Sequence, residues 1–222
     1  MTHLLIGAAI FFGGHLLLSS GPVRPRLAAA LGERGFLALY STVALVGLIW
    51  LGYGYAVAPS EPWWGGPALA VVPLVLMAPA ALLYVGAFSQ RNPTSVGQSA
   101  DGEAARGIVR ITRHPFLWAM ALWAIGHLVV NGDFPSVVMF GGILALAFIG
   151  MGEIDRKTRA RDPESWAAFE ARTSVVPFAA IAQGRNRLVW SEIGWWRLAL
   201  AAALYAALLA LHPFVIGVSP VG

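Results

Sequence analysis

The chain has 222 residues, of which 58% are hydrophobic and only 12% are charged, and its formal net charge is +4. Soluble domains carry about a quarter charged residues, so this composition excludes an ordinary soluble protein and indicates a polytopic helical membrane protein. The chain has no cysteine, which excludes disulfides, thiolate metal sites, iron–sulfur clusters and covalently attached c-type haem.

Six segments are long and apolar enough to cross about 30 Å of hydrocarbon as helices. They occupy residues 3–20, 35–57, 67–89, 116–131, 136–152 and 195–217. We therefore predict an all-α membrane protein in which residues 1–222 form a single domain and residues 153–194 form the one sizeable loop. No Lys or Arg precedes the first segment and no small-residue cleavage site follows it, so we expect a retained span rather than a signal peptide.

The positive charges are confined to alternate connections between these spans. The first, third and fifth connections and the start of the last span hold all Lys and Arg residues, whereas the second and fourth hold only Glu61 and Asp133. Because positively charged loops stay in the cytoplasm, we predict a bacterial inner-membrane protein with both termini outward and the loop 153–194 cytoplasmic. The expected partner of these charges is the lipid bilayer, and no nucleic acid is expected.

Three connecting stretches carry local structural signals. Residues 131–135, Asn-Gly-Asp-Phe-Pro, predict a tight turn between the fourth and fifth spans. Residues 106–113 alternate apolar and Arg side chains, which predicts an amphipathic segment lying on the membrane surface. Residues 162–164, Asp-Pro-Glu, predict a helix start, and Trp166 and Phe169 share one face of the helix that follows.

Two of the five histidines, His15 and His127, lie inside predicted spans among apolar neighbours. An ionisable ring in hydrocarbon is costly unless it has a partner, so each is either a functional ligand or a group that hydrogen-bonds between helices. Both follow glycine, which would let a flat macrocycle or another helix come close, and no acid lies at their depth. Two neutral imidazoles from two helices can hold haem b, so we predict His15 and His127 as metal ligands.

The tripeptide Arg113-His114-Pro115 stands at the start of the fourth span. Proline disfavours a helical conformation at the residue before it, so His114 is presented at a helix break. The guanidinium of Arg113 suits a carboxylate or a phosphate. The tripeptide is either a basic anchor or a binding site, and Arg113 and Arg110 would be placed to pair with haem propionates or an acidic substrate.

Several motifs resemble the NnrU family over the whole chain. They are Phe11-Phe12-Gly13-Gly14-His15, Gly21-Pro22-Val23-Arg24, Arg91-Asn92-Pro93, the run from Gly107 to Pro115, and Leu122-Trp123-Ala124-Ile125-Gly126-His127. That family is associated with denitrification and nitric oxide metabolism. It is similar to plant zeta-carotene isomerase, a membrane haem b enzyme that isomerises a polyene double bond.

This resemblance implies a haem b-binding protein with His15 and His127 as ligands, and an isomerase that acts on an apolar small molecule. Ala124 stands where the isomerase has a cysteine, so ligand switching through a thiolate is not available to this chain.

The run that contains Arg113 and His114 also resembles the isoprenylcysteine and phospholipid methyltransferases. Their second motif is echoed by Gly152-Glu153, Trp166, Phe169 and Val176-Pro177, whereas Leu117 and Ala119 stand where they have tyrosine and glycine. This resemblance implies an alternative cofactor, S-adenosylmethionine, at a site of Arg113, His114 and Glu153. A non-catalytic membrane assembly factor is a third alternative.

Overall fold

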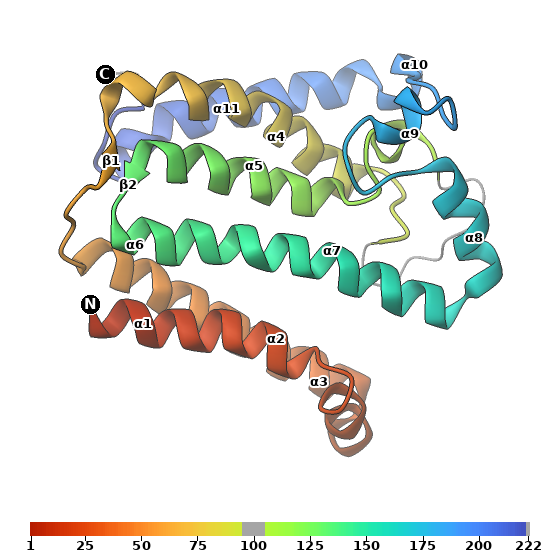
Figure 1. Cartoon of the computed structure of the whole chain (residues 1–222), viewed down its shortest axis with the longest axis horizontal. Coiled ribbons are helices and arrows are strands. Elements are labelled where there is room, and N and C mark those ends of the chain that lie inside the picture. Colours follow the sequence, from red (N-terminus) through yellow and green to blue (C-terminus); the bar gives the residue numbers. More distant parts are fainter. Residues whose placement is uncertain (95–104, 221–222) are drawn as a thin grey trace. The chain divides into compact units, whose positions relative to one another are not determined.

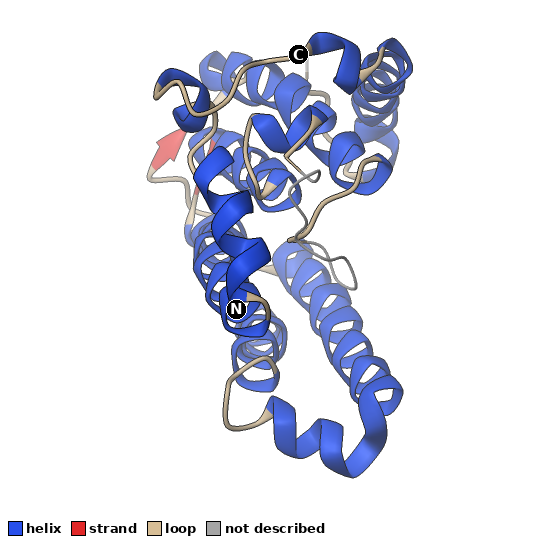
Figure 2. Ribbon diagram, turned by 90° about the vertical axis from the view of Figure 1, so that its right-hand side faces the viewer, coloured by secondary structure: helices blue, strands red, loops and turns tan. Residues whose placement is uncertain are grey.

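The computed structural model describes residues 1–94 and 105–220, and helices make up most of this part of the chain (Figures 1 and 2). Six apolar helical segments coincide with the six predicted spans. Four are long enough to cross a membrane, namely Arg24–Val57, Pro67–Ser89, Phe134–Arg161 and Trp195–Val215, and two are shorter, Thr2–Leu18 and Pro115–Val130. The prediction of an all-α helical membrane protein is therefore confirmed.

The chain packs as two compact units. The first comprises Met1–Gly66 and His127–Leu146, and the second comprises Pro67–Gly126 and Ala147–Gly222. The residues predicted to bind haem fall in different units. His15 and His127 belong to the first unit, whereas Arg110 and Arg113 belong to the second, as do His114 and Glu153 of the alternative site.

The first unit is built from the N-terminal helices and from the turn between the fourth and fifth spans. Its elements are α1 (Thr2–Ala8), the π-helical η1 (Ala9–Gly13), α2 (Gly14–Leu18), α3 (Arg24–Val57), β1 (Trp64–Gly65), the end of α5 (Pro115–Val130), β2 (Asn131–Gly132), α6 (Phe134–Ser136), the π-helical η5 (Val137–Gly141) and the start of α7 (Gly142–Arg161). Gly32 interrupts α3, because its φ of 71° is not helical. In the fifth predicted span, residues 136–152, the helix is longer than expected, since α7 continues to Arg161.

Glycines bring α1 and α3 into direct backbone contact. A side chain at Gly54 would overlap the backbone of Leu4, and one at Gly7 would overlap the backbone of Leu51. Leu4 and Leu51 are both fully buried. Membrane helices commonly associate through such small residues, because close backbones gain van der Waals contact where no hydrophobic driving force exists.

A two-residue strand pair closes the end of the first unit. Trp64 pairs with Gly132 and Gly65 pairs with Asn131 in antiparallel register. Gly65 has a φ of 102°, a conformation that favours glycine. The indole of Trp64 donates to the carbonyl of Leu128 at 3.1 Å, so this pair also satisfies a carbonyl of the last turn of α5. The predicted turn at residues 131–135 is confirmed.

The second unit surrounds a core formed by segments far apart in the sequence. Its elements are η2 (Pro67–Leu69), α4 (Val71–Ser89), η4 (Gly107–Arg110), most of α5, the remainder of α7, α8 (Pro163–Arg172), α9 (Ala179–Ala182), α10 (Trp190–Ile193) and α11 (Trp195–Val215). The predicted helix after residue 162 is confirmed as α8. Asp162 caps it by accepting a hydrogen bond from the Ser165 amide at 3.2 Å, and Trp166 and Phe169 are buried.

The prediction that residues 106–113 lie on the membrane surface is wrong. Ile108 and Val109 of η4 are 0% exposed and pack in the same cluster as Trp166 and Phe169. Of the three arginines in this stretch, Arg106 is exposed, but Arg110 and Arg113 are buried. A mixture of arginine and apolar residues favours a surface only when the arginines lack partners inside the protein, and Arg110 and Arg113 have such partners.

Candidate functional site

The imidazole of His15 is held by the irregular helix that precedes it. In the π-helical η1 the backbone is locally widened, and α2 begins one residue before His15. The Nδ1 atom of His15 lies 2.7 Å from the carbonyl oxygen of Phe11. Only a protonated Nδ1 can donate to this carbonyl, so the neutral ring keeps the lone pair of Nε2.

Aromatic rings surround His15. The ring of Phe11 lies 4.6 Å from it, between centroids, and the ring of Tyr40 from α3 lies 5.3 Å away, edge-on. These neighbours are aromatic side chains of η1 and α3, so His15 lies in a mainly apolar setting.

His127 lies in the last turn of α5, where both its backbone and its ring are contacted. The Asn131 side chain donates to the carbonyl of His127 at 3.0 Å. The ring of His127 stacks on Phe140, with 5.0 Å between centroids and 30° between planes. Phe140 belongs to the second π-helical segment, η5. Each of the two histidines is thus associated with a π-helical segment, a feature that often marks functional sites.

The two π-helical segments belong to the same unit and connect through a ring. Phe12 of η1 packs against Gly142, immediately after η5, so closely that a Cβ on Gly142 would overlap the ring. Phe12 also packs edge-on against Phe11, with centroids 5.2 Å apart. Aromatic rings thus contact both histidines: His15 meets Phe11 and Tyr40, and His127 meets Phe140.

The glycines before the two histidines serve helix packing rather than an open space. A Cβ on Gly14 would lie 2.8 Å from Val43 of α3, and one on Gly126 would lie 2.9 Å from Pro73 of α4. Gly13, which precedes Gly14, differs from these two glycines, because a Cβ there would meet no atom within 4 Å. Among the described residues, no group of three or more His, Asp or Glu side chains could hold a metal ion. A site with two imidazoles does not require such a group.

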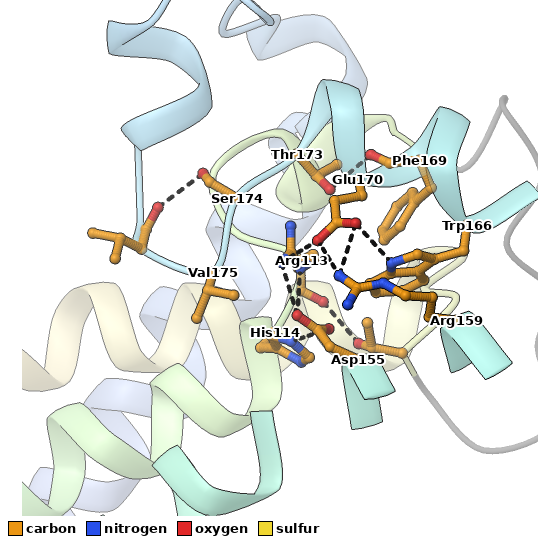
Figure 3. A network of polar contacts seen from close by, with 12 residues as sticks. Arg113, His114, Asp155, Arg159, Trp166, Phe169, Glu170, Thr173, Ser174 and Val175 are labelled. Carbon is orange, nitrogen blue, oxygen red and sulfur yellow. Dashed lines mark hydrogen bonds and ion pairs between the residues drawn. The ribbon is translucent and has the colours of Figure 1, made fainter. Parts of the chain in front are cut away.

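A separate polar network lies in the second unit and contains Arg113 and His114 (Figure 3). Asp155 of α7 joins the two: its Oδ2 accepts from Arg113 Nε at 2.9 Å and Nη2 at 2.7 Å, and its Oδ1 lies 2.8 Å from His114 Nε2. The His114 side chain is 0% exposed, and its Nδ1 has no hydrogen-bond partner among residues 1–94 and 105–220. Asp155 therefore compensates a buried guanidinium and fixes a buried imidazole.

Glu170 of α8 extends this network towards the surface. It accepts from the indole of Trp166 at 3.0 Å and from Arg159 at 2.7 Å, and it also lies 3.4 Å from Arg113. The guanidinium of Arg113 lies over the Trp166 ring, 5.5 Å from its centroid. Figure 3 shows these side chains converging from the connection between η4 and α5, from α7 and from α8.

The structure does not bring Glu153 to Arg113 and His114, as the alternative site required. Its side chain is 43% exposed and pairs with Arg156 at 2.7 Å, one helical turn away. Asp155 occupies the position expected for Glu153. The sequence carried a signal for this, because Ala147, Met151, Asp155 and Thr158 form the buried stripe of α7 at helical spacing, and Glu153 lies off that stripe.

Arg110 is likewise committed within the protein. Its Nε and Nη2 donate to Glu192 at 2.6 and 2.8 Å, which makes the ion pair bidentate. Its Nη1 donates to the side-chain oxygen of Asn186. The hydrogen bonds from Arg110 are the main reason why the pKa of Glu192 falls from its usual 4.5 to about 2. Both arginines that the sequence assigned to haem propionates therefore have carboxylate partners in the second unit.

Apolar helices long enough to cross a bilayer, with a buried imidazole and buried guanidinium groups beside one of them, define an integral membrane protein with polar side chains in its interior. The family model described as NnrU protein matches residues 3–220. The chain belongs to the NnrU family.

Curated relatives come from plants. The chain is 37% identical over 82 residues to the chloroplastic 15-cis-zeta-carotene isomerases of Zea mays and Arabidopsis thaliana. The match covers 37% of this chain but only 22% of each relative, so it does not extend to most of those proteins. No solved structure matches the chain.

Proposed function

We propose that the first unit binds haem b through His15 and His127, and that the protein is an isomerase of an apolar substrate with a carbon–carbon double bond. The observation that carries this proposal is the 2.7 Å contact between His15 Nδ1 and the Phe11 carbonyl. A backbone carbonyl behind a histidine fixes its tautomer and ring orientation and leaves the other nitrogen for a metal.

The residues around the two histidines have defined roles in this proposal. Phe11, Tyr40 and Phe140 pack on the imidazoles. These aromatic rings would offer a matching surface to the apolar part of a substrate. Haem iron would supply a centre that accepts or donates one electron.

The comparisons support the isomerase reading through the printed activity of the two plant relatives. Because the match covers a small part of each relative, we extend their activity to this chain as a proposal. The link to denitrification and nitric oxide metabolism that the family resemblance implied is the alternative role for the same haem. Titration of the haem-loaded protein with nitric oxide would separate the two roles.

The methyltransferase alternative has less support. Arg113 and His114, which would bind S-adenosylmethionine, are both engaged by Asp155, and Glu153 faces away from them with Arg156. A cofactor that used Arg113 would have to displace a buried carboxylate.

The test is the visible spectrum of the protein purified from cells supplied with a haem precursor. We expect sharp bands on reduction that indicate low-spin haem b with two axial imidazoles. His15→Ala or His127→Ala should give loss of haem or a five-coordinate spectrum, whereas His3→Ala and His212→Ala should leave the bands unchanged. Conversion of 15-cis-zeta-carotene, followed by chromatography of its isomers, then tests the reaction.

Two results would contradict the proposal. The first is a folded, colourless protein that takes up no added haemin. The second is full haem occupancy in the double variant His15→Ala, His127→Ala.

A further inference from the structure

A buried carboxylate, Asp133, anchors a chain of hydroxyl groups in the first unit. Its Oδ1 accepts from the Ser136 amide at 2.8 Å, and its Oδ2 accepts from the hydroxyl of Ser60. Burial acts to raise the pKa of Asp133, but the hydrogen bonds from Ser136 and Ser60 outweigh it, and the pKa lies below its usual value. Asp133 is therefore anionic at neutral pH and can only accept hydrogen bonds.

Ser136 connects this carboxylate to Tyr55. The Ser136 amide donates to Asp133 Oδ1, and the Ser136 hydroxyl is hydrogen-bonded to the hydroxyl of Tyr55 at 3.1 Å. Ser136 is fully buried, so a chain of polar contacts runs inside the protein from Tyr55 through Ser136 to Asp133.

The ring of Tyr55 reaches His127 through Phe140. Tyr55 meets Phe140 edge-on, with centroids 5.6 Å apart and planes at 74°. Phe140 is buried and stacks in turn on the His127 ring. A phenol that is tethered at its hydroxyl cannot slide along Phe140, so it limits the rotation of that ring and of the imidazole stacked on it.

We propose that Asp133, Ser136 and Tyr55 are positioning residues that set the plane of the His127 imidazole. The backbone of His127 is fixed independently, since Asn131 holds its carbonyl. The hydroxyl chain acts on the ring of the residue instead, through Phe140. Its importance for haem ligation rests on the proposed function, but the ring orientation itself exists without haem.

The decisive variant is Tyr55→Phe, which keeps the ring against Phe140 and removes only the tether to Ser136. The measurement is the nuclear magnetic resonance spectrum of ¹⁵N- and ¹³C-histidine-labelled apoprotein in nanodiscs, with His127 assigned from the His127→Asn variant. We expect the His127 ring signals to shift and broaden in Tyr55→Phe and in Ser136→Ala. Ser136→Thr, which keeps the hydroxyl, should restore the wild-type signals.

Tyr53→Phe is the matched control, because it removes a hydroxyl from the same helix at an exposed ring that packs on His3. Its His127 signals should equal those of the wild type, and thermal unfolding should show that all variants fold. Unchanged His127 signals in Tyr55→Phe, or equal shifts in Tyr53→Phe, would overturn the proposal. Failure of the wild type to bind haem would contradict the proposed function while leaving this apoprotein result valid.

Discussion

At the scale of single residues, Asp155 is the side chain on which the polar interior of the second unit depends. It serves two buried groups at once, the guanidinium of Arg113 and the imidazole of His114. A buried ion pair adds little stability compared with an apolar pair, but loss of one partner leaves an uncompensated buried charge. Removal of Asp155 should therefore cost more stability than the intact ion pair adds, because it leaves the buried charge of Arg113 uncompensated.

Replacing Asp155 by Ala should therefore destabilise the protein by about 3–5 kcal/mol, because Arg113 would remain buried without its main partner. Chemical denaturation in mild detergent, followed by tryptophan fluorescence, measures this. The control Glu153→Gln lies on the exposed side of the same helix and should change stability by about 0.5 kcal/mol or less. Equal effects of both substitutions would show that the network is not buried as described.

The pair of Arg110 and Glu192 should give the second unit an acid-sensitive stability. The pKa of Glu192 falls from 4.5 to about 2 in the folded protein. A depressed folded-state pKa stabilises the fold above pH 4.5, and this contribution is lost as the pH falls from 4.5 towards 2.

Thermal unfolding across this pH range should show a steeper loss of stability for the wild type than for Glu192→Gln, which cannot titrate. Glu61→Gln, at an exposed position, should retain the wild-type slope. A Glu192→Gln curve parallel to that of the wild type would mean that this carboxylate does not titrate with a depressed pKa.

At the scale of elements, the contact between α1 and α3 depends on glycines at particular positions of α3. Gly54→Ala places a methyl group against the backbone of Leu4, and such overpacking costs about 1–3 kcal/mol. Gly52→Ala, on the same helix, meets nothing within 4 Å and should be neutral or stabilising by about 0.5–1 kcal/mol. Thermal stability in detergent compares the two, and similar losses would mean that α1 does not pack there.

The sequence predicts which helices form, but it does not predict which of them contact each other. The apolar spans and the cap at Asp162 are local signals, and the corresponding helices are present. Residues 106–113 were misplaced because Arg110 finds its carboxylate at Glu192, far along the chain. Local alternation cannot reveal such a partner.

The candidate sites show the same limit. Arg113 and His114 were chosen by their neighbours in sequence, whereas their common partner Asp155 could be found only from the buried stripe of α7. The glycines before His15 and His127 predict that either a flat macrocycle or another helix comes close. In the structure Gly14 meets Val43 of α3 and Gly126 meets Pro73 of α4. The sequence could not decide between the two, because a glycine permits close approach without specifying what approaches.

At the scale of the whole molecule, the family match over residues 3–220 means that both units belong to one NnrU protein. The proposed topology follows from the charges and from the six apolar segments, since all Lys and Arg residues fall in alternate connections and the start of the last span. An even number of spans returns both termini to the same side, and the positive loops assign that side as the one opposite the cytoplasm.

Fusions of a compartment-sensitive reporter test this topology. A reporter at Gly222 should be active outside the cytoplasm, and one inserted near Ala180 should be active inside it, because α8 to α10 lie in the arginine-rich connection. Reporters that read the same compartment at both positions would exclude a six-span protein.

The strand pair between Trp64 and Gly132 has a consequence for how this protein is made. The two strands are separated in the chain by two membrane segments, α4 and α5, so the ribosome synthesises β1 well before its partner exists. Until β2 has been synthesised, the hydrogen bonds from the Trp63 amide to Gly132 and from the Gly66 amide to Val130 cannot form. Pairing of β1 with β2 should therefore be a late event of biogenesis. In a chain that stalls before the fifth span inserts, residues 58–66 would be an unpaired loop that a quality-control protease could cut.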